Sequence, residues 1–260
     1  RSTGYDHLAR YVAETGFPAA GCGYLPLYCA RAVAEQAALL WLALLRKLGA
    51  QLEQFRRFHR DGLTGGECAG RTLLVVGVGN IGLQVARIGE GLGMTVLGVD
   101  IVRRHAGVNY VSIDEGLPRA DVIVCAMNLT KANAGYFSAD RLRRAKAGAV
   151  FINIARGELA PPAALAEALD AGTLAGVGLD VYDHEPQLAA DLRAGRTPDE
   201  PASRATLDLC RRPNVLATPH NAFNTREAVS RKAADTARQV QHFVQTGQFL
   251  WPIPPPEEGE

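Results

Sequence analysis

Short, continuously apolar runs recur along the chain from residue 72 onward. They cover residues 72–77, 95–99, 121–126, 149–154, 175–181 and 214–217, and helical patterns separate several of them at about 80–92, 138–145 and 161–171. Strands that are apolar on both faces and alternate with helices predict a parallel sheet that is covered on both sides. We therefore expect an α/β fold with a doubly wound parallel sheet.

Helical patterns dominate both ends of the chain. Residues 29–48 predict a long helix that stops at Gly49, and a more polar helix follows at about 50–60. The first is apolar almost all round from Ala37 to Leu45, which predicts burial in a core or a subunit interface. Residues 226–246 predict an amphipathic helix, and the proline-rich, acidic residues 251–260 predict an extended, solvated tail.

Composition excludes several classes of function. The 260 residues are 47% hydrophobic and carry a net charge of +1, so neither a disordered polyelectrolyte nor a binder of nucleic acid or anionic membranes is expected. The longest apolar run has nine residues, whereas a membrane span needs about 20. Five cysteines without a Cys-x-x-Cys pair argue against a disulfide framework or a zinc knuckle and favour a reducing cytoplasm.

A glycine-rich turn follows the first apolar run. Gly77, Gly79 and Gly82 fit the pattern G-x-G-x-x-G between a predicted strand and a predicted helix, the arrangement that binds a dinucleotide pyrophosphate at a helix N-terminus. Asp100 ends the next strand, where a carboxylate holds the adenosine ribose hydroxyls and repels a 2′-phosphate. The sequence thus predicts a Rossmann-type domain that binds NAD rather than NADP. The alternative is a tight turn without a nucleotide.

Polar residues follow three later strands. Arg156, Glu185 and His220 come soon after the runs at 149–154, 175–181 and 214–217, and ligands bind outside the carboxyl ends of parallel strands. Arginine binds a carboxylate through its planar fork, histidine moves a proton near neutral pH, and a neighbouring glutamate favours the imidazolium. Together they predict proton transfer on an anionic substrate. Taken singly, they read equally as a surface arginine, a turn-capping glutamate and a structural histidine.

Several segments together resemble the D-isomer-specific 2-hydroxyacid dehydrogenase family. They are Gly4-Tyr-Asp-His7, Ala32-Val-Ala-Glu35, the glycine turn with Asp100, Asn153-Ile-Ala-Arg-Gly157, Gly178-Leu-Asp-Val-Tyr182 with Glu185-Pro186, and Thr218-Pro-His220. They run in family order over nearly the whole chain. The aromatic Phe223 and the long segment between Glu185 and His220 are most similar to the D-lactate dehydrogenase branch.

The resemblance implies a role for each matching residue. Arg156 would anchor a 2-keto or 2-hydroxy acid, His220 would be the general acid or base, and Glu185 would keep His220 protonated. Hydride would pass directly to or from NAD, so no metal is expected. The other implied cofactor-binding residues are Asn80 and Ile81 at the pyrophosphate, Met127, Asn128 and Asn133 along the cleft, and Ile154, Ala155 and Asp180 around the nicotinamide.

The resemblance also implies how the chain is organised. Residues 1–24 would be the end of a truncated, flavodoxin-like substrate domain, 25–222 the dinucleotide-binding domain, and 223–260 a helix and tail that return to the substrate domain. The resemblance further implies a homodimer, and a small 2-keto acid such as pyruvate is the expected substrate. Ala126, Asn128 and Ala160-Pro161 depart from the usual family residues. Two alternatives remain open, an NADH-sensing protein of the co-repressor type and an inactive NAD-binding fragment.

Overall fold

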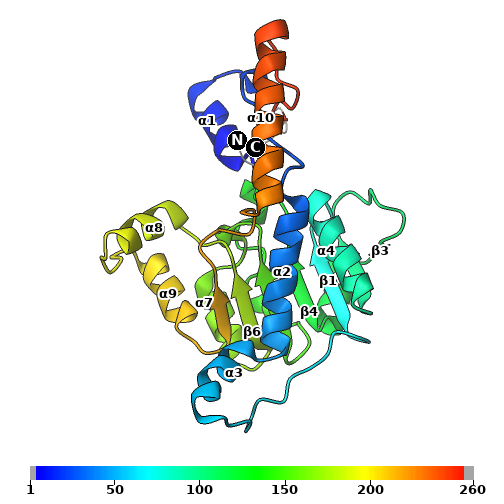
Figure 1. The fold of residues 1–260 in the computed structure, drawn as a ribbon, viewed down its shortest axis with the longest axis vertical. Coiled ribbons are helices and arrows are strands. Elements are labelled where there is room, and N and C mark those ends of the chain that lie inside the picture. Colours follow the sequence, from blue (N-terminus) through cyan, green and yellow to red (C-terminus); the bar gives the residue numbers. More distant parts are fainter. Residues whose placement is uncertain (1–3, 255–260) are drawn as a thin grey trace.

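The computed structural model describes residues 4–254 and contains one doubly wound sheet (Figure 1). Within these residues the sheet has seven strands in the order β3-β2-β1-β4-β5-β6-β7, and every neighbouring pair is parallel. The predicted α/β class is confirmed. The strands are β1 Thr72–Val76, β2 Thr95–Val99, β3 Asn109–Tyr110, β4 Val122–Cys125, β5 Ala149–Asn153, β6 Leu174–Leu179 and β7 Val215–Ala217.

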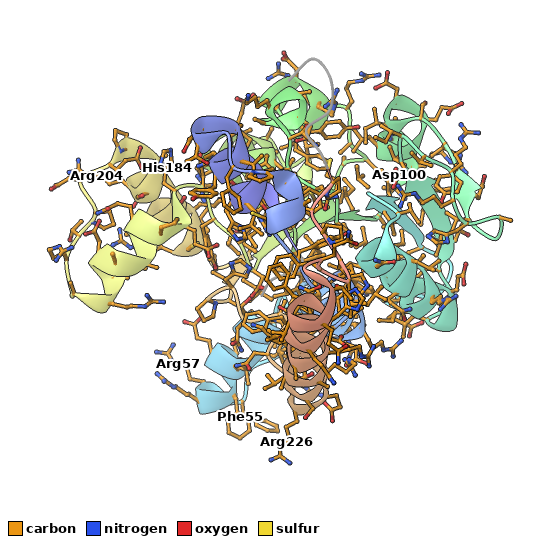
Figure 2. All side chains as sticks on the ribbon, turned by 90° about the horizontal axis from the view of Figure 1, so that it is seen from above. Phe55, Arg57, Asp100, His184, Arg204 and Arg226 are labelled. Atoms are coloured by element: carbon orange, nitrogen blue, oxygen red, sulfur yellow. The ribbon has the colours of Figure 1, made fainter. Side chains whose placement is uncertain are left out.

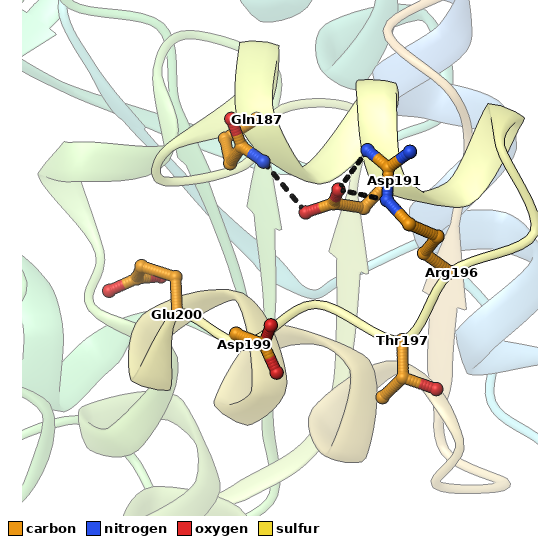
Figure 3. Close-up of a pocket in the computed structure, with 6 residues that line it drawn as sticks. All are labelled: Gln187, Asp191, Arg196, Thr197, Asp199 and Glu200. Carbon is orange, nitrogen blue, oxygen red and sulfur yellow. Dashed lines mark hydrogen bonds and ion pairs between the residues drawn. The ribbon is translucent and has the colours of Figure 1, made fainter.

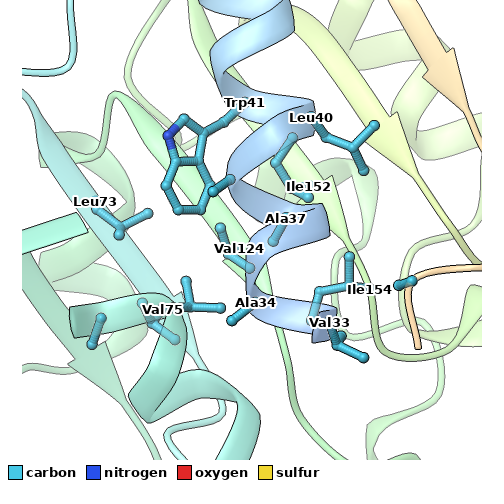
Figure 4. Close-up of a cluster of buried hydrophobic side chains, with 14 of the residues drawn as sticks. Val33, Ala34, Ala37, Leu40, Trp41, Leu73, Val75, Val124, Ile152 and Ile154 are labelled. Atoms are coloured by element: carbon cyan, nitrogen blue, oxygen red, sulfur yellow. The ribbon is translucent and has the colours of Figure 1, made fainter. Parts of the chain in front are cut away.

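Alternate residues of the strands feed two separate cores, one on each face of the sheet. Leu73 and Val75 belong to the cluster under α2 (Ala30–Leu45) and α4 (Asn80–Gly91), in which Trp41 is fully buried (Figure 4). Leu74 and Val76 belong to the second cluster, which α6 (Ala139–Leu142), α7 (Pro162–Asp170) and α9 (Pro201–Cys210) cover. Burial on both faces explains why the strands read as unbroken apolar runs.

The first long helix is shorter than predicted. It ends at Leu45, and the chain turns at Lys47, which adopts a left-handed conformation with φ 52°. The Lys47 ammonium donates to the carbonyl of Gly62 at 2.7 Å, which helps to hold this turn. The predicted stop at Gly49 is therefore wrong, because Gly49 lies inside the next helix, α3 (Leu48–Gln54), which continues into the 3-10 turn Phe55–Arg57.

The remaining elements are short or lie at the edges of the domain. Three helices were not predicted from the sequence. Helices α8 and α9 lie between Glu185 and His220, and helix α1 lies before residue 20. The elements not yet named are α1 Asp6–Thr15, α5 Ile113–Gly116, α8 Glu185–Arg193, α10 Arg226–Thr246, and the 3-10 turns Ala19–Gly21, Leu117–Arg119, Lys131–Asn133 and Gly157–Leu159.

The two ends of the chain meet outside the main domain. Helix α10 extends away from the sheet beside α1 (Figure 1). Ile253 is only 3% exposed, contacts the cluster of Val12 and Cys22, and donates its N–H to the Cys22 carbonyl. The predicted solvated tail is thus wrong up to Ile253, because this apolar residue completes a small core; residues 255–260 lie outside the described part. Among the described helices, none has the length and apolar character to cross a lipid bilayer.

Candidate active site

The glycine turn joins β1 to α4 and leaves open space in front of the helix. Gly77 has φ +94°, and a Cβ there would lie 2.5 Å from the backbone of Met127. A Cβ on Gly82 would overlap the carbonyl group of Gly77, whereas a Cβ on Gly79 would meet nothing within 4 Å. The N–H groups of the first helical turn, from Asn80 on, have no intrahelical acceptor and face an incoming anion. The turn therefore fits a pyrophosphate.

Asp100 lies at the carboxyl end of β2, beside this turn (Figure 2). One carboxylate oxygen accepts from the backbone N–H of Val78 at 2.6 Å, and the other accepts from Val102 at 3.0 Å. Each oxygen keeps a further lone pair that a ribose hydroxyl can use. Asp100 thus shapes the turn as well as offering a ribose contact.

Glu185 and His220 come together although 35 residues separate them. His220 Nδ1 lies 2.6 Å from Glu185 Oε1, while Glu185 Oε2 accepts from the backbone N–H of Tyr182. The hydrogen bond from Glu185, aided by its charge, raises the pKa of His220 above its usual value against the opposing effect of burial. The imidazolium is therefore favoured to higher pH than in a free histidine.

Asp180 holds the loop that carries His220. The carboxylate is 1% exposed; one oxygen accepts from the Thr218 hydroxyl at 2.6 Å and the Asn221 N–H at 2.9 Å, and the other from the Ala222 N–H at 2.9 Å. His220 itself has φ 50°, a left-handed conformation that is costly for a residue with a side chain. Three bonds to one buried carboxylate stabilise this strained turn.

Arg156 follows β5 in a loop that a buried amide shapes. The Asn153 side chain donates to the Arg156 carbonyl at 2.8 Å and accepts from the Ala155 N–H at 3.0 Å. The Arg156 guanidinium binds the Asp6 carboxylate from α1, and its positive charge partly opposes the rise in the pKa of His220. Sequence reasoning missed Asn153 and Asp6 as functional residues, although both lie in segments that carry the family resemblance.

The other predicted cofactor residues lie along the same edge. Met127, Asn128 and Asn133 follow β4, and the Asn133 amide donates to the Asn128 carbonyl at 2.8 Å, which braces that loop. Ile154 and Ala155 are 6% and 9% exposed at the end of β5. Of these residues, Met127 lies directly against Gly77 of the glycine turn.

A cavity of about 250 Å³ lies elsewhere, between α8 and α9 (Figure 3). Inside it the Asp191 carboxylate accepts from Gln187 at 2.9 Å and from Arg196 at 2.7 Å. None of Arg156, Glu185 and His220 lines this cavity. The sheet edge, where these three residues lie, is therefore the candidate active site.

Comparison with known proteins identifies the family. The family model for the NAD-binding domain of D-isomer-specific 2-hydroxyacid dehydrogenases matches residues 38–222. The chain belongs to this family. A 2-hydroxyacid dehydrogenase A from Aspergillus oryzae is 34% identical to this chain, across 94% of the chain and 70% of the relative. A D-lactate dehydrogenase from Streptococcus agalactiae is 31% identical, across 86% and 69%.

A solved structure extends the likeness to three dimensions. The structure of D-lactate dehydrogenase from Aquifex aeolicus complexed with NAD and lactic acid has a TM-score of 0.85 and 31% identity, and covers 96% of this chain and 78% of that one. The predicted family, Rossmann-type fold and NAD cofactor are confirmed. The expectation of an NAD-dependent oxidoreductase is confirmed at the level of this 2-hydroxyacid dehydrogenase family.

Proposed function

We propose that the site interconverts a small 2-keto acid and its D-2-hydroxy acid with NAD(H), and that D-lactate and pyruvate are the model pair. The observation that carries this proposal is the 2.6 Å contact between His220 and Glu185 at the same sheet edge as Arg156. An acid with a raised pKa and a carboxylate-binding cation are the two groups that reduction of a keto acid requires.

Each side chain has one task in the reduction. Arg156 binds the substrate carboxylate and polarises the neighbouring carbonyl. His220 uses Nδ1 for Glu185, so Nε2 is the nitrogen that delivers a proton to the carbonyl oxygen. Glu185 keeps the ring charged and fixes its orientation. NADH supplies the hydride when bound, and the glycine turn with Asp100 holds its pyrophosphate and ribose.

A substrate panel tests this proposal. We expect NADH oxidation when pyruvate or a slightly larger 2-keto acid is added to the protein. His220→Gln should reduce kcat by about 10²–10⁴-fold, because the proton donor is lost. A wild-type protein that binds NADH and reduces no 2-keto acid in a broad panel would overturn the proposal and favour an NADH sensor or an inactive fragment.

We also propose the predicted division into residues 1–24, 25–222 and 223–260. It is supported by the separate small core of Val12, Cys22 and Ile253, which joins the first and last of these segments away from the sheet. Limited proteolysis should cleave first near residues 24 and 223. Cleavage inside the sheet region at an equal rate would contradict this division.

We propose that the protein is a homodimer. Four large apolar side chains are exposed on α3 and the turn after it, namely Leu48, Leu52, Phe55 and Phe58. Phe55 and Phe58 are 73% and 79% exposed, and Phe55 is labelled at the edge of the molecule in Figure 2. A cluster of this kind is typical of a protein interface. Sedimentation should give twice the chain mass, and Phe55→Ser with Phe58→Ser should give the monomer; a monomeric wild-type protein would contradict it. We also propose a cytoplasmic location, because no disulfide joins the cysteines within residues 4–254.

A further inference from the structure

The carboxylate of Asp6 binds Arg156 from the far end of the chain. Asp6 Oδ1 accepts from Arg156 Nη2 at 2.7 Å and from Nε at 3.1 Å, across 150 positions of sequence. Arg156 Nη1 donates to the Ala155 carbonyl at 2.8 Å. Only 27% of the Arg156 side chain and 25% of the Asp6 side chain is exposed. The guanidinium is thus held in its plane by oxygens from two directions.

We propose that Asp6 is a positioning residue for Arg156, which fixes the guanidinium so that its remaining N–H groups face the substrate carboxylate. The proposal rests on the proposed function of Arg156. A guanidinium has five N–H groups, and residues 4–254 engage three of them, which leaves two for a bound anion as far as these residues go. Fixing the fork in advance matters because small displacements of a binding group reduce rates steeply.

The surroundings of Asp6 are built for this contact. Burial by itself would raise the pKa of Asp6, but the hydrogen bond and charge of Arg156 outweigh it and hold the pKa below its usual value. Gly4 packs directly on the Arg156 guanidinium: a Cβ added at Gly4 would overlap Nη2 and would lie 2.9 Å from Cζ. A side chain at this position would push the guanidinium out of place. The segment from Gly4 to Asp6 therefore forms one wall of the substrate site.

The negative charge of Asp6 and its positioning of Arg156 predict opposite effects on the KM for the keto acid when Asp6 is removed, which makes the proposal testable. A carboxylate next to Arg156 repels an anionic substrate, so a merely competing Asp6 would weaken binding, and its removal would lower KM. A positioning Asp6 keeps the fork aligned, so its removal raises KM. Asn retains an oxygen at Oδ1 that can accept the same two bonds, so Asp6→Asn should keep the alignment while it removes the charge.

The experiment compares Asp6→Ala, Asp6→Asn and the control Glu14→Ala, an exposed acidic residue on the same helix. Pyruvate reduction, NADH affinity and oxamate affinity of the NADH complex are measured. We expect kcat/KM to fall about 10- to 100-fold in Asp6→Ala, through a higher KM and weaker oxamate binding. Asp6→Asn should recover most of the loss, Glu14→Ala should stay within about twofold, and all should bind NADH normally.

The outcomes separate this proposal from the one on which it rests. A lower KM in Asp6→Ala, or equal losses in Asp6→Ala and Asp6→Asn, overturns the positioning role while the proposed function stands. A wild-type protein that binds NADH but neither reduces any 2-keto acid of the panel nor binds oxamate overturns both. Gly4→Ala removes no charge and no hydrogen bond of the pair, so it provides a second test. It should raise KM in the same direction as Asp6→Ala, and an unchanged KM would count against the proposal.

Discussion

Asp180→Asn tests how the fold holds the catalytic histidine. The amide oxygen replaces only one of the two carboxylate oxygens, which together accept three bonds from the 218–222 loop. If the amide oxygen keeps the hydrogen bonds from the Thr218 hydroxyl and the Asn221 N–H, the new NH₂ group faces the Ala222 N–H. Two buried donors then oppose each other. The loss of a hydrogen bond to a charged group and the unsatisfied donor together cost about 2–4 kcal/mol of the free energy of unfolding.

Urea unfolding of Asp180→Asn and of Asp208→Asn measures this cost. Asp208 is a matched control, since its side chain is 72% exposed and its ion pair with Arg211 should contribute below about 0.5 kcal/mol. Asp180→Asn should also reduce the rate of keto-acid reduction, because the left-handed turn at His220 is less well held. A variant no less stable than the Asp208→Asn control would refute the reasoning about the loop.

Three further variants address the site. Arg156→Lys keeps the charge but loses the planar fork, so KM for the keto acid should rise about tenfold or more with unchanged NADH affinity; an equal loss of both would contradict the assigned role. The reduction needs protonated His220, so its rate should fall as pH rises through the raised pKa of that residue. Glu185→Gln removes the largest cause of the raised pKa, so the midpoint of the pH profile should move to lower pH. An unmoved midpoint would argue against the pairing of Glu185 with His220. Asp100→Ala should weaken NAD binding, reduce discrimination against NADP and lower Tm, because Val78 loses its hydrogen-bond acceptor; an unchanged preference would assign the ribose to another residue.

The parallel sheet could be predicted because its signals are local, whereas the short strand β3 was missed. Both faces of β1, β4 and β5 are buried, so these strands read as unbroken apolar runs, and Gly77 to Gly82 identify the first turn. The C-terminal end of α2 was not predicted correctly, because it depends on a left-handed turn at Lys47, and lysine has no preference for that conformation. Helices α8 and α9 were missed, since each buries only a few side chains.

The candidate site was predictable in its residue types but not in its contacts. The positions of Arg156, Glu185 and His220 after successive strands follow from the parallel sheet. The bond between Asp6 and Arg156 does not, because it joins two side chains 150 positions apart in the sequence. The role of Asp180 in the His220 loop was also invisible, since a strand-end carboxylate in sequence resembles a ligand-binding group more than the anchor of a turn.

A structure of the protein with NADH and oxamate tests the central claim most directly. The account predicts that the oxamate carboxylate lies on the free N–H groups of Arg156, with its carbonyl oxygen within hydrogen-bond distance of His220 Nε2 and the nicotinamide beside it. Oxamate bound away from both residues, for example in the cavity between α8 and α9, would contradict the account.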